Sequence, residues 1–316
     1  MIKIIADSTC DLSDEVLARY HICIAPLVIQ INNKEYKDRI DIKPDEFYRM
    51  MMDLDKNPTT AMPSPAEFLR CMEEGIAEDC KEILCICMSS GTSGSYQSAM
   101  IAKELFYEQY NPSEYKIHVV DSLCMSHGSG YLILKSALLR EAGYTFEELV
   151  EFNETFKKHI KHYLSVDDLD NLIRSGRLSN ASAFIGKMLK LKPIMSMRDG
   201  KGAIVAKERG RRNVLDYYVR EFTKRVDEEL TTFIIIGYTS DKAYAENLKL
   251  KLLQECNYKN DIYIMQMGVS VGVHVGLGAV SMFFIEKDGH HDGLLINELN
   301  NFLVKRDEFL KKSKAK

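Results

Sequence analysis

Short apolar runs alternate with helix-like segments along the first half of the chain. Runs rich in β-branched residues lie at 2–6, 22–31, 83–88 and 117–120. Segments typical of helices separate them, at 14–20, 64–77, 94–110 and 129–141. Short, uninterrupted apolar runs are the form of strands that are buried on both faces of a parallel sheet. The alternation therefore predicts a doubly wound α/β domain over residues 1–164.

Three helices carry recognisable start signals. Ser13 is placed to cap the helix that begins at Asp14, and Thr145 with Glu148 forms a capping box for a helix over 145–160. The stretch 64–67 reads Ser-Pro-Ala-Glu, a second capping box with proline at the first helical position. These N-cap signals predict the first residue of each helix, which hydrophobic periodicity does not.

The pattern changes near residue 165. A helical stretch over 167–191 is broken at Ser175-Gly176, and the segments 193–198 and 203–208 flank Asp199-Gly200 as a hairpin. Helices at 213–227 and 241–255 and strands at 232–238, 262–267 and 280–285 follow. We therefore expect a second α/β domain over 165–316, with a mixed or antiparallel sheet. Its charged tail, 297–316, is expected to be helical and then to fray into solvent rather than bind a membrane.

Composition narrows the function classes. The 316 residues, 46% of them hydrophobic, suffice for two cores, and the net charge of −4 gives no footprint for nucleic acid. No apolar run approaches a signal peptide or the ~18 residues of a membrane span, so we expect a cytoplasmic protein with at most peripheral membrane contact. The eight cysteines are scattered without a CxxC pair, which favours reduced, buried thiols.

A loop rich in hydroxyls and glycine, 89–95, lies between a predicted strand and a predicted helix. Backbone N–H groups converge at a helix N-terminus and bind anions there. The loop is neither a Walker loop nor a GxGxxG turn. A plain capped turn is the alternative interpretation. Three further strand ends or loops carry hydroxyls, at 7–9, 58–64 and 121–122, and together the four favour a small-anion site at the carboxyl edge of the sheet.

The second half offers basic and catalytic candidates. A carboxylate or phosphate would suit five arginines, although a charged run is more often a solvated face: Arg174, Arg177, Arg209, Arg211 and Arg212. The glycine-rich stretch 268–278 contains Ser270 and His274 and matches the G-x-S-x-G pattern of hydrolases. A nucleophile elbow needs a helix after the turn, which this stretch is not expected to form. The segment 290–292, His-His-Asp, is expected to be a surface turn and not a metal site.

The chain resembles the DegV family over nearly its whole length. The resemblance rests on Asp-Ser-Thr-Cys-Asp-Leu at 7–12, on the stretch 89–99, on Asp121-Ser122 and on Leu-Asp-Asn-Leu-Ile-Arg-Ser-Gly-Arg-Leu at 169–178. Lys-Pro-Ile at 192–194 and the turn 274–279 complete it. Characterised members are fatty-acid-binding subunits of a bacterial fatty acid kinase.

The resemblance implies a long acyl chain in a tunnel between two domains. The carboxylate-binding groups would be Thr60, Thr92, Ser93, Gly94 and His274. Arg177, Arg209 and Arg211 would face the ATP-binding kinase subunit, which phosphorylates the bound acid to an acyl-phosphate. The chain itself would then be no enzyme, and would need no cofactor or metal.

Two loops depart from the family pattern. The usual Thr-Ser-Gln-Pro-Ser appears as Thr-Ala-Met-Pro-Ser, with Ala61 and Met62, and the usual His-Thr-Gly-Pro-Gly appears as His-Val-Gly-Leu-Gly, with Val275 and Leu277. Both changes make the site more apolar. Three alternatives stay open: a stand-alone hydrolase that uses Ser270, a phosphotransferase that uses His274, and a lipid-sensing regulator.

Overall fold

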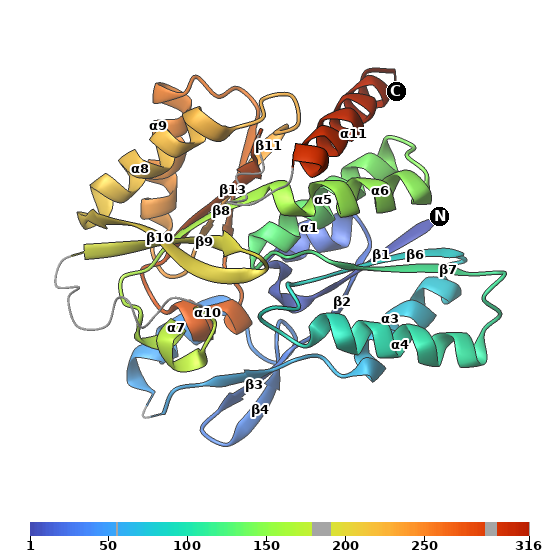
Figure 1. The fold of residues 1–316 in the computed structure, drawn as a ribbon. Coiled ribbons are helices and arrows are strands. Elements are labelled where there is room, and N and C mark those ends of the chain that lie inside the picture. The colour runs from blue at the N-terminus through green and yellow to red at the C-terminus, as the bar shows by residue number, and fades with distance from the viewer. Residues whose placement is uncertain (55, 179–190, 288–295, 316) are drawn as a thin grey trace.

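Four parallel strands form the first sheet. The computed structural model describes residues 1–54, 56–178, 191–287 and 296–315. The strand order is β2-β1-β6-β7, with β1 (Ile2–Asp7), β2 (Ile22–Ala25), β6 (Glu82–Cys87) and β7 (Lys116–Asp121). Helices α3 (Pro65–Ala77) and α4 (Ser95–Gln109) pack on one face. Helices α1 (Asp14–Arg19), α5 (His127–Glu141) and α6 (Phe146–Phe156) pack on the other, so the doubly wound prediction is confirmed (Figure 1).

The apolar run at 22–31 is two strands, not one. β2 ends at Ala25, and β3 (Val28–Ile31) pairs with β4 (Lys34–Lys37) and β5 (Thr59–Ala61) in a separate antiparallel sheet. Pro26 lies at the break, where its missing N–H cannot continue a ladder. Helix α2 (Pro44–Met50) follows β4. The small sheet carries Thr60 opposite Ile29, next to the end of the parallel sheet.

Six strands form the sheet of the second half, in the order β10-β9-β8-β13-β11-β12. The bounds are β8 (Ile160–Ser165), β9 (Leu191–Arg198), β10 (Lys201–Arg209), β11 (Phe233–Tyr238), β12 (Asp261–Gln266) and β13 (Val280–Ile285). Only β11 and β12 pair in parallel, which confirms the mixed sheet. The hairpin is also confirmed, because Asp199 and Gly200 both have positive φ, as a type I′ turn requires.

Strand β8 was missed by the sequence analysis. The expected helix over 145–160 ends at Phe156, and a short 3-10 turn leads into β8. The chain joins the second sheet there, so the expected boundary between residues 164 and 165 falls inside β8. Helices α8 (Gly210–Arg225) and α9 (Lys242–Glu255) pack against this sheet.

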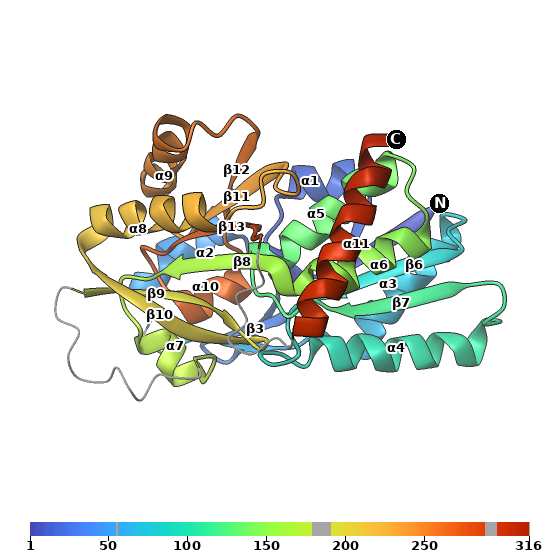
Figure 2. The same ribbon diagram turned by 45° about the horizontal axis from the view of Figure 1, so that its top comes forward.

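Helix α5 lies between the two sheets (Figure 2). Apolar residues of α5, such as Leu132 and Ile133, share one core with Ile4 of the first sheet and with Phe283 of the second. Nearly every residue of α5 is buried, as expected for a helix surrounded by protein. The halves of the chain are therefore held together by a common core.

Two short helices border the space between the sheets. α7 (Asp170–Ser175) ends where Gly176 has a φ of 70°, which confirms the predicted break. The second expected helical piece lies outside the described residues, as do 290–292. α10 (Val269–Val275) corrects the sequence analysis, because the glycine-rich stretch does form a helix, capped by Gly268.

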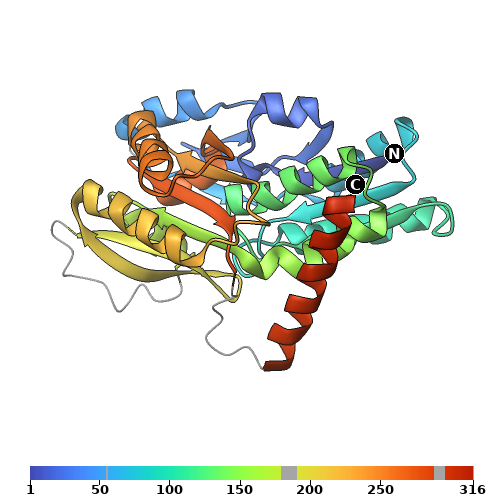
Figure 3. The ribbon, with the colours of Figure 1, turned by 90° about the horizontal axis from the view of Figure 1, so that it is seen from above.

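The C-terminal helix α11 (Ile296–Ala315) crosses α6 in Figure 3. Phe309 packs against Phe152 and Phe156, and Arg306 Nε donates to Asp227 at 2.6 Å. The expected helix of the tail is therefore confirmed, and it continues to Ala315. No described helix combines the length and the apolar character that crossing a membrane demands.

Local signals were right at some positions and wrong at others. Ser13 caps α1, and Thr145 forms the complete capping box of α6. Ser64 is the N-cap of α3, but its side chain makes no capping hydrogen bond, and Glu67 N donates to Ser64 O instead. The Glu67 carboxylate pairs with Lys37. The expectation that all cysteines are reduced is also wrong. A disulfide joins Cys23 of β2 to Cys71 of α3, and the other six are free.

Candidate functional site

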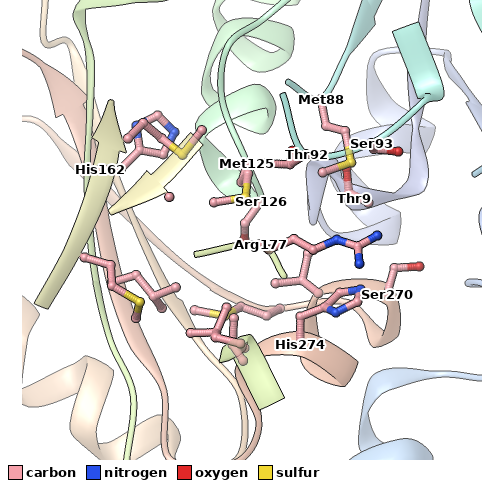
Figure 4. Close-up of a pocket in the computed structure, with 18 of the residues that line it drawn as sticks. Thr9, Met88, Thr92, Ser93, Met125, Ser126, His162, Arg177, Ser270 and His274 are labelled. Atoms are coloured by element: carbon pink, nitrogen blue, oxygen red, sulfur yellow. The ribbon is translucent and has the colours of Figure 1, made fainter. Parts of the chain in front are cut away.

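A cavity of about 270 Å³ lies between the two sheets (Figure 4). Its wall takes residues from both halves of the chain: β5 and the loop before α4 on one side, and β8, β9, β13, α7 and α10 on the other. The lining is largely apolar. Polar groups gather where β5, the loop before α4 and α10 meet, and this region is called the head end of the cavity below.

The loop before α4 holds two available hydrogen-bond donors. Ser89 O accepts from the N–H groups of Thr92 and Ser93, and also from Thr92 Oγ1 at 3.0 Å. The Thr92 hydroxyl hydrogen is therefore already used. Ser93 Oγ accepts from Ser95 N at 3.2 Å and lies 3.0 Å from Ser95 Oγ, where either hydroxyl can donate. When Ser95 donates, the hydrogen of Ser93 is available to a ligand. The N–H of Gly94 donates to no group among the described residues.

Thr60 and His274 form a pair at the same end. Thr60 Oγ1 lies 2.8 Å from His274 Nε2, although 214 positions separate the two residues. Burial, with a smaller contribution from the charge of Arg177, lowers the pKa of His274 to about 4, so the ring is neutral near pH 7. His274 Nδ1 is buried without a hydrogen-bond partner.

The three predicted arginines lie in different surroundings. Arg177 follows α7, lines the cavity and donates to Ser175 O. It is the cation of the described cavity wall. Arg211 instead binds Asp167 and Asp241, at 2.7 and 2.6 Å. Arg209 is exposed at the end of β10.

Most polar side chains of the motif at 7–12 form hydrogen bonds that hold neighbouring segments of the chain in place. Asp7 accepts from Met88 N at 2.9 Å, and burial raises its pKa. Ser8 donates to Asp38 at 2.8 Å and accepts from Leu27 N. Thr9 is the residue of this trio that lines the cavity. The hydroxyls near β1 therefore hold backbone segments in place rather than facing the cavity together.

Asp11 and Asp121 anchor the neighbouring loops. Asp121 accepts from Ser90 N at 3.0 Å and so fixes the loop before α4. Asp11 accepts from Gly268 N at 2.8 Å and from the Ser126 hydroxyl, which ties the N-terminal motif to the starts of α5 and α10. Burial raises the pKa of Asp11 to about 8. The carboxylates thus position the head end without entering it.

Sequence reasoning missed most of the apolar wall. Six methionines contribute to it: Met62, Met88, Met125, Met195, Met197 and Met267. Phe283, His162 and Ser281, from β13 and β8, also line it. Met62 lies within a recognised motif and Met88, Met195 and Met267 each adjoin one, but no signal in the sequence distinguished the six methionines from ordinary core residues.

Ser270 does not have the surroundings of a catalytic nucleophile. It lies in the first turn of α10, is 2% exposed, and donates to Asp38 Oδ2 at 2.6 Å. Among the described residues, no histidine is hydrogen-bonded to it, since His274 pairs with Thr60. Within the same residues there is also no cluster of three side chains suited to hold a metal ion.

Known proteins resemble this chain over about 90% of its length in both sequence and structure. A DegV domain-containing protein of Clostridium acetobutylicum is 37% identical over 291 residues, which are 90% of this chain and 99% of that protein. The structure of a stearic acid-binding protein from Eubacterium ventriosum superposes with a TM-score of 0.82 at 26% identity, covering 91% of this chain and 99% of that one.

A third protein shares the fold. The fatty acid kinase B3 protein of Streptococcus pneumoniae, solved with linoleic acid, has a TM-score of 0.76 at 24% identity, with 90% and 99% of the two chains covered. The family model that matches residues 1–287 is that of the DegV family, described as uncharacterised proteins. With this match, the 37% identity and the shared fold, the chain belongs to the DegV family.

Proposed function

We propose that the cavity binds a long-chain fatty acid, with the carboxylate at the head end and the acyl chain along the methionine-rich wall. The observation that carries this proposal is a set of polar groups at one end of an otherwise apolar cavity. Gly94 N has no acceptor among the described residues, and the hydroxyls of Ser93 and Thr60 can donate to a ligand when Ser95 and His274 donate to them. An apolar pocket with a few convergent polar groups is the form of a small-molecule site.

The head group is expected to be held without a metal. The carboxylate would accept from Ser93 Oγ, Gly94 N and Thr60 Oγ1. His274 would donate through Nε2 to Thr60, which orients the hydroxyl hydrogen of Thr60 toward the ligand. Hydrogen bonds to a charged acceptor contribute about 1.5–3 kcal/mol each. The charge of Arg177 in the wall further favours an anion.

The acyl chain supplies the larger part of the affinity. Burying about fourteen methylenes at ~0.8 kcal/mol each contributes roughly 11 kcal/mol before the cost of ordering the ligand is subtracted. Methionine side chains adapt to irregular shapes, which suits a flexible chain. Thr92 plays a lesser part, because its hydroxyl already donates to Ser89 O.

The direct test is a calorimetric titration of the delipidated protein with oleic acid. Thr60→Ala is expected to weaken binding at least tenfold. Thr59→Ala is the matched control, because Thr59 is the exposed neighbour on β5 and lies outside the cavity wall. Equal affinities for the two variants, or no binding by the unmodified protein, would refute the proposal.

We further propose that the protein presents the bound acid to an ATP-binding kinase subunit, which forms an acyl-phosphate, and that it is not itself catalytic. The partnership is supported by the resemblance to fatty acid kinase subunits and by two arginines. Arg177 lies beside His274, and Arg209 is exposed. Because ATP is the phosphate donor, the proposed setting is the cytoplasm.

Phosphoryl transfer tests this partnership separately from binding. The protein loaded with oleic acid is incubated with labelled ATP and the ATP-binding subunit of a bacterial fatty acid kinase. Labelled acyl-phosphate is expected, with at least tenfold less from Arg177→Ala at saturating oleic acid. Arg212→Ala, which changes an exposed arginine on α8, is the control. Absence of any acyl-phosphate would contradict the kinase partnership and leave the binding proposal standing.

A further inference from the structure

The tip of the β9–β10 hairpin touches the loop before α4, although the two segments belong to different halves of the chain. Ser89 Oγ donates to Gly200 O at 2.6 Å, across 111 positions of sequence, and both residues are buried. The hairpin is also part of the cavity wall, through Met195 and Met197 of β9. One element of the second half therefore contacts both the apolar wall and the loop of the head end.

Ser89 connects this contact to the donors of the head end. Its carbonyl oxygen accepts from the N–H groups of Thr92 and Ser93, which closes the turn that carries the Ser93 hydroxyl. Its N–H donates to Cys124 O at 2.8 Å, and its hydroxyl donates to Gly200 O. Because 0% of Ser89 is exposed, water cannot replace these partners. The turn of the head end is therefore tied to the hairpin tip through one residue.

Two glycines allow this contact to be so close. A Cβ on Gly91 would lie 2.6 Å from Gly200 O, a backbone atom that cannot turn aside as a flexible side chain does. A Cβ on Gly200 would lie 2.7 Å from Ser89 Oγ, and Gly200 has a φ of 74°, a conformation that favours glycine. Gly91 N also donates to Ser89 Oγ, at 3.3 Å. The hairpin tip and the loop therefore fit as two bare backbone segments joined by the Ser89 hydroxyl.

The head end needs both halves of the chain to be in register. Ser93 and Gly94 belong to the first half, whereas His274, which pairs with Thr60, belongs to the second. A carboxylate that accepts from all of these donors at once requires the two halves to hold one relative position. The Ser89 hydrogen bond joins the halves within five residues of Ser93 and Gly94. It is therefore placed to fix that position where the ligand would bind.

We propose that Ser89 is a positioning residue for the carboxylate: its hydrogen bond to Gly200 O fixes the donors of Ser93 and Gly94 against the second half of the chain before the ligand arrives. Donors that are already in place lose less conformational freedom on binding, so the carboxylate is held more tightly. Ser89 is not among the residues that line the cavity, so it acts through its neighbours. This inference rests on the proposed binding of a fatty acid and deepens it.

Ser89→Ala removes the hydroxyl and keeps the backbone of the loop. Delipidated full-length protein is titrated by calorimetry with oleic acid and with oleyl alcohol, which has the same chain and no carboxylate. The variant is expected to bind oleic acid about tenfold more weakly and oleyl alcohol less than about twofold more weakly. A role in stability alone would leave the ratio of the two affinities unchanged, because both ligands need the same folded cavity.

Gly91→Ala tests the same contact from the other side. It keeps the Ser89 hydroxyl, but the new Cβ meets Gly200 O and pushes the hairpin tip away, so the same selective loss for oleic acid is expected. The φ of Gly91 lies outside the left-handed region, so the effect of alanine is the clash with Gly200.

Thr231→Val is the matched control. Thr231 Oγ1 is also buried and donates to a backbone carbonyl, Ile285 O at 3.0 Å, but both residues lie outside the cavity wall, so this variant should keep the ratio of affinities. Circular dichroism checks that each variant is folded, and either Ser89→Ala or Gly91→Ala alone suffices. If the ratio is unchanged in a folded variant of Ser89 or Gly91, the positioning role is refuted and the proposed function stands. If the unmodified protein binds no oleic acid, both fail.

Discussion

The two ends of the cavity are built in different ways. At the head end, Ser93 and Gly94 belong to one short loop, and their donors are set by local hydrogen bonds around Ser89. At the far end, His162 and Ser281 come together only because β8 and β13 pair across more than a hundred residues of chain. The head end depends on a turn and a helix start, whereas the far end depends on the register of a sheet.

The polar groups at the two ends also differ in how far they are exposed to water. The donors at the head end are partly exposed and can be satisfied by water when no ligand is bound. The polar atoms at the far end, His162 Nε2 and Ser281 Oγ, are buried against Gly128 and Gly237 and have no hydrogen-bond partner among the described residues. The head end therefore presents polar groups to a ligand, whereas the far end presents mainly apolar side chains.

Removing both head-end hydroxyls should have the largest effect. Thr60→Ala combined with Ser93→Ala is expected to weaken oleic acid binding on the order of 100-fold, because two charge-assisted hydrogen bonds are lost. Titration calorimetry measures the loss. Methyl oleate lacks the ionised carboxylate, and its binding should change far less. An equal loss for acid and ester would show that these hydroxyls do not contact the carboxylate.

Filling the space at Gly128 should disturb the far end through packing. In Gly128→Ala the new Cβ meets His162 Nε2, so the ring must move, at a cost of about 1–3 kcal/mol in the free energy of unfolding. Urea denaturation measures this cost. Gly75→Ala is the control, because its Cβ comes no closer than 3.2 Å to Lys3 and 3.7 Å to Ile83, so a small shift suffices and the cost should be lower. Equal stabilities for the two variants would contradict the packing described for His162.

Asp11 should give an effect on stability that depends on pH. Burial raises its pKa from 3.8 to about 8, so the folded state keeps a proton that the unfolded state has lost. The resulting stability is present below about pH 4 and is lost as the pH rises through 8, by up to about 1.4 kcal/mol per pH unit.

Asp11→Asn does not titrate, so its stability relative to the unmodified protein should rise between pH 5 and pH 8. Asp7 and Asp38, whose pKa values are also raised by burial, are present in both proteins and cancel in the difference. Urea denaturation across this pH range measures the difference. A difference that stays constant with pH would show that Asp11 is ionised in the folded protein.

The same contrast between local and long-range contacts separates the features that the sequence predicted from those it did not. Local signals identified the loop before α4, the hairpin at Asp199-Gly200 and the break at Gly176, because each depends on residues close in sequence. Strand β8 was missed because residues 161–164 were assigned to no element. Helix α10 was missed because its glycines disfavour a helix that tertiary packing stabilises. The methionine wall has no sequence signal, since burial in a core and burial in a cavity wall require the same residue type.

The central claim is that this cavity holds a fatty acid, and one measurement tests it most directly. The protein is purified without added lipid and denatured, and its organic extract is analysed by mass spectrometry. We predict about one fatty acid per chain, strongly reduced in the variant that lacks the Thr60 and Ser93 hydroxyls. An extract without fatty acid, from protein that also fails to bind added oleic acid, would contradict the account.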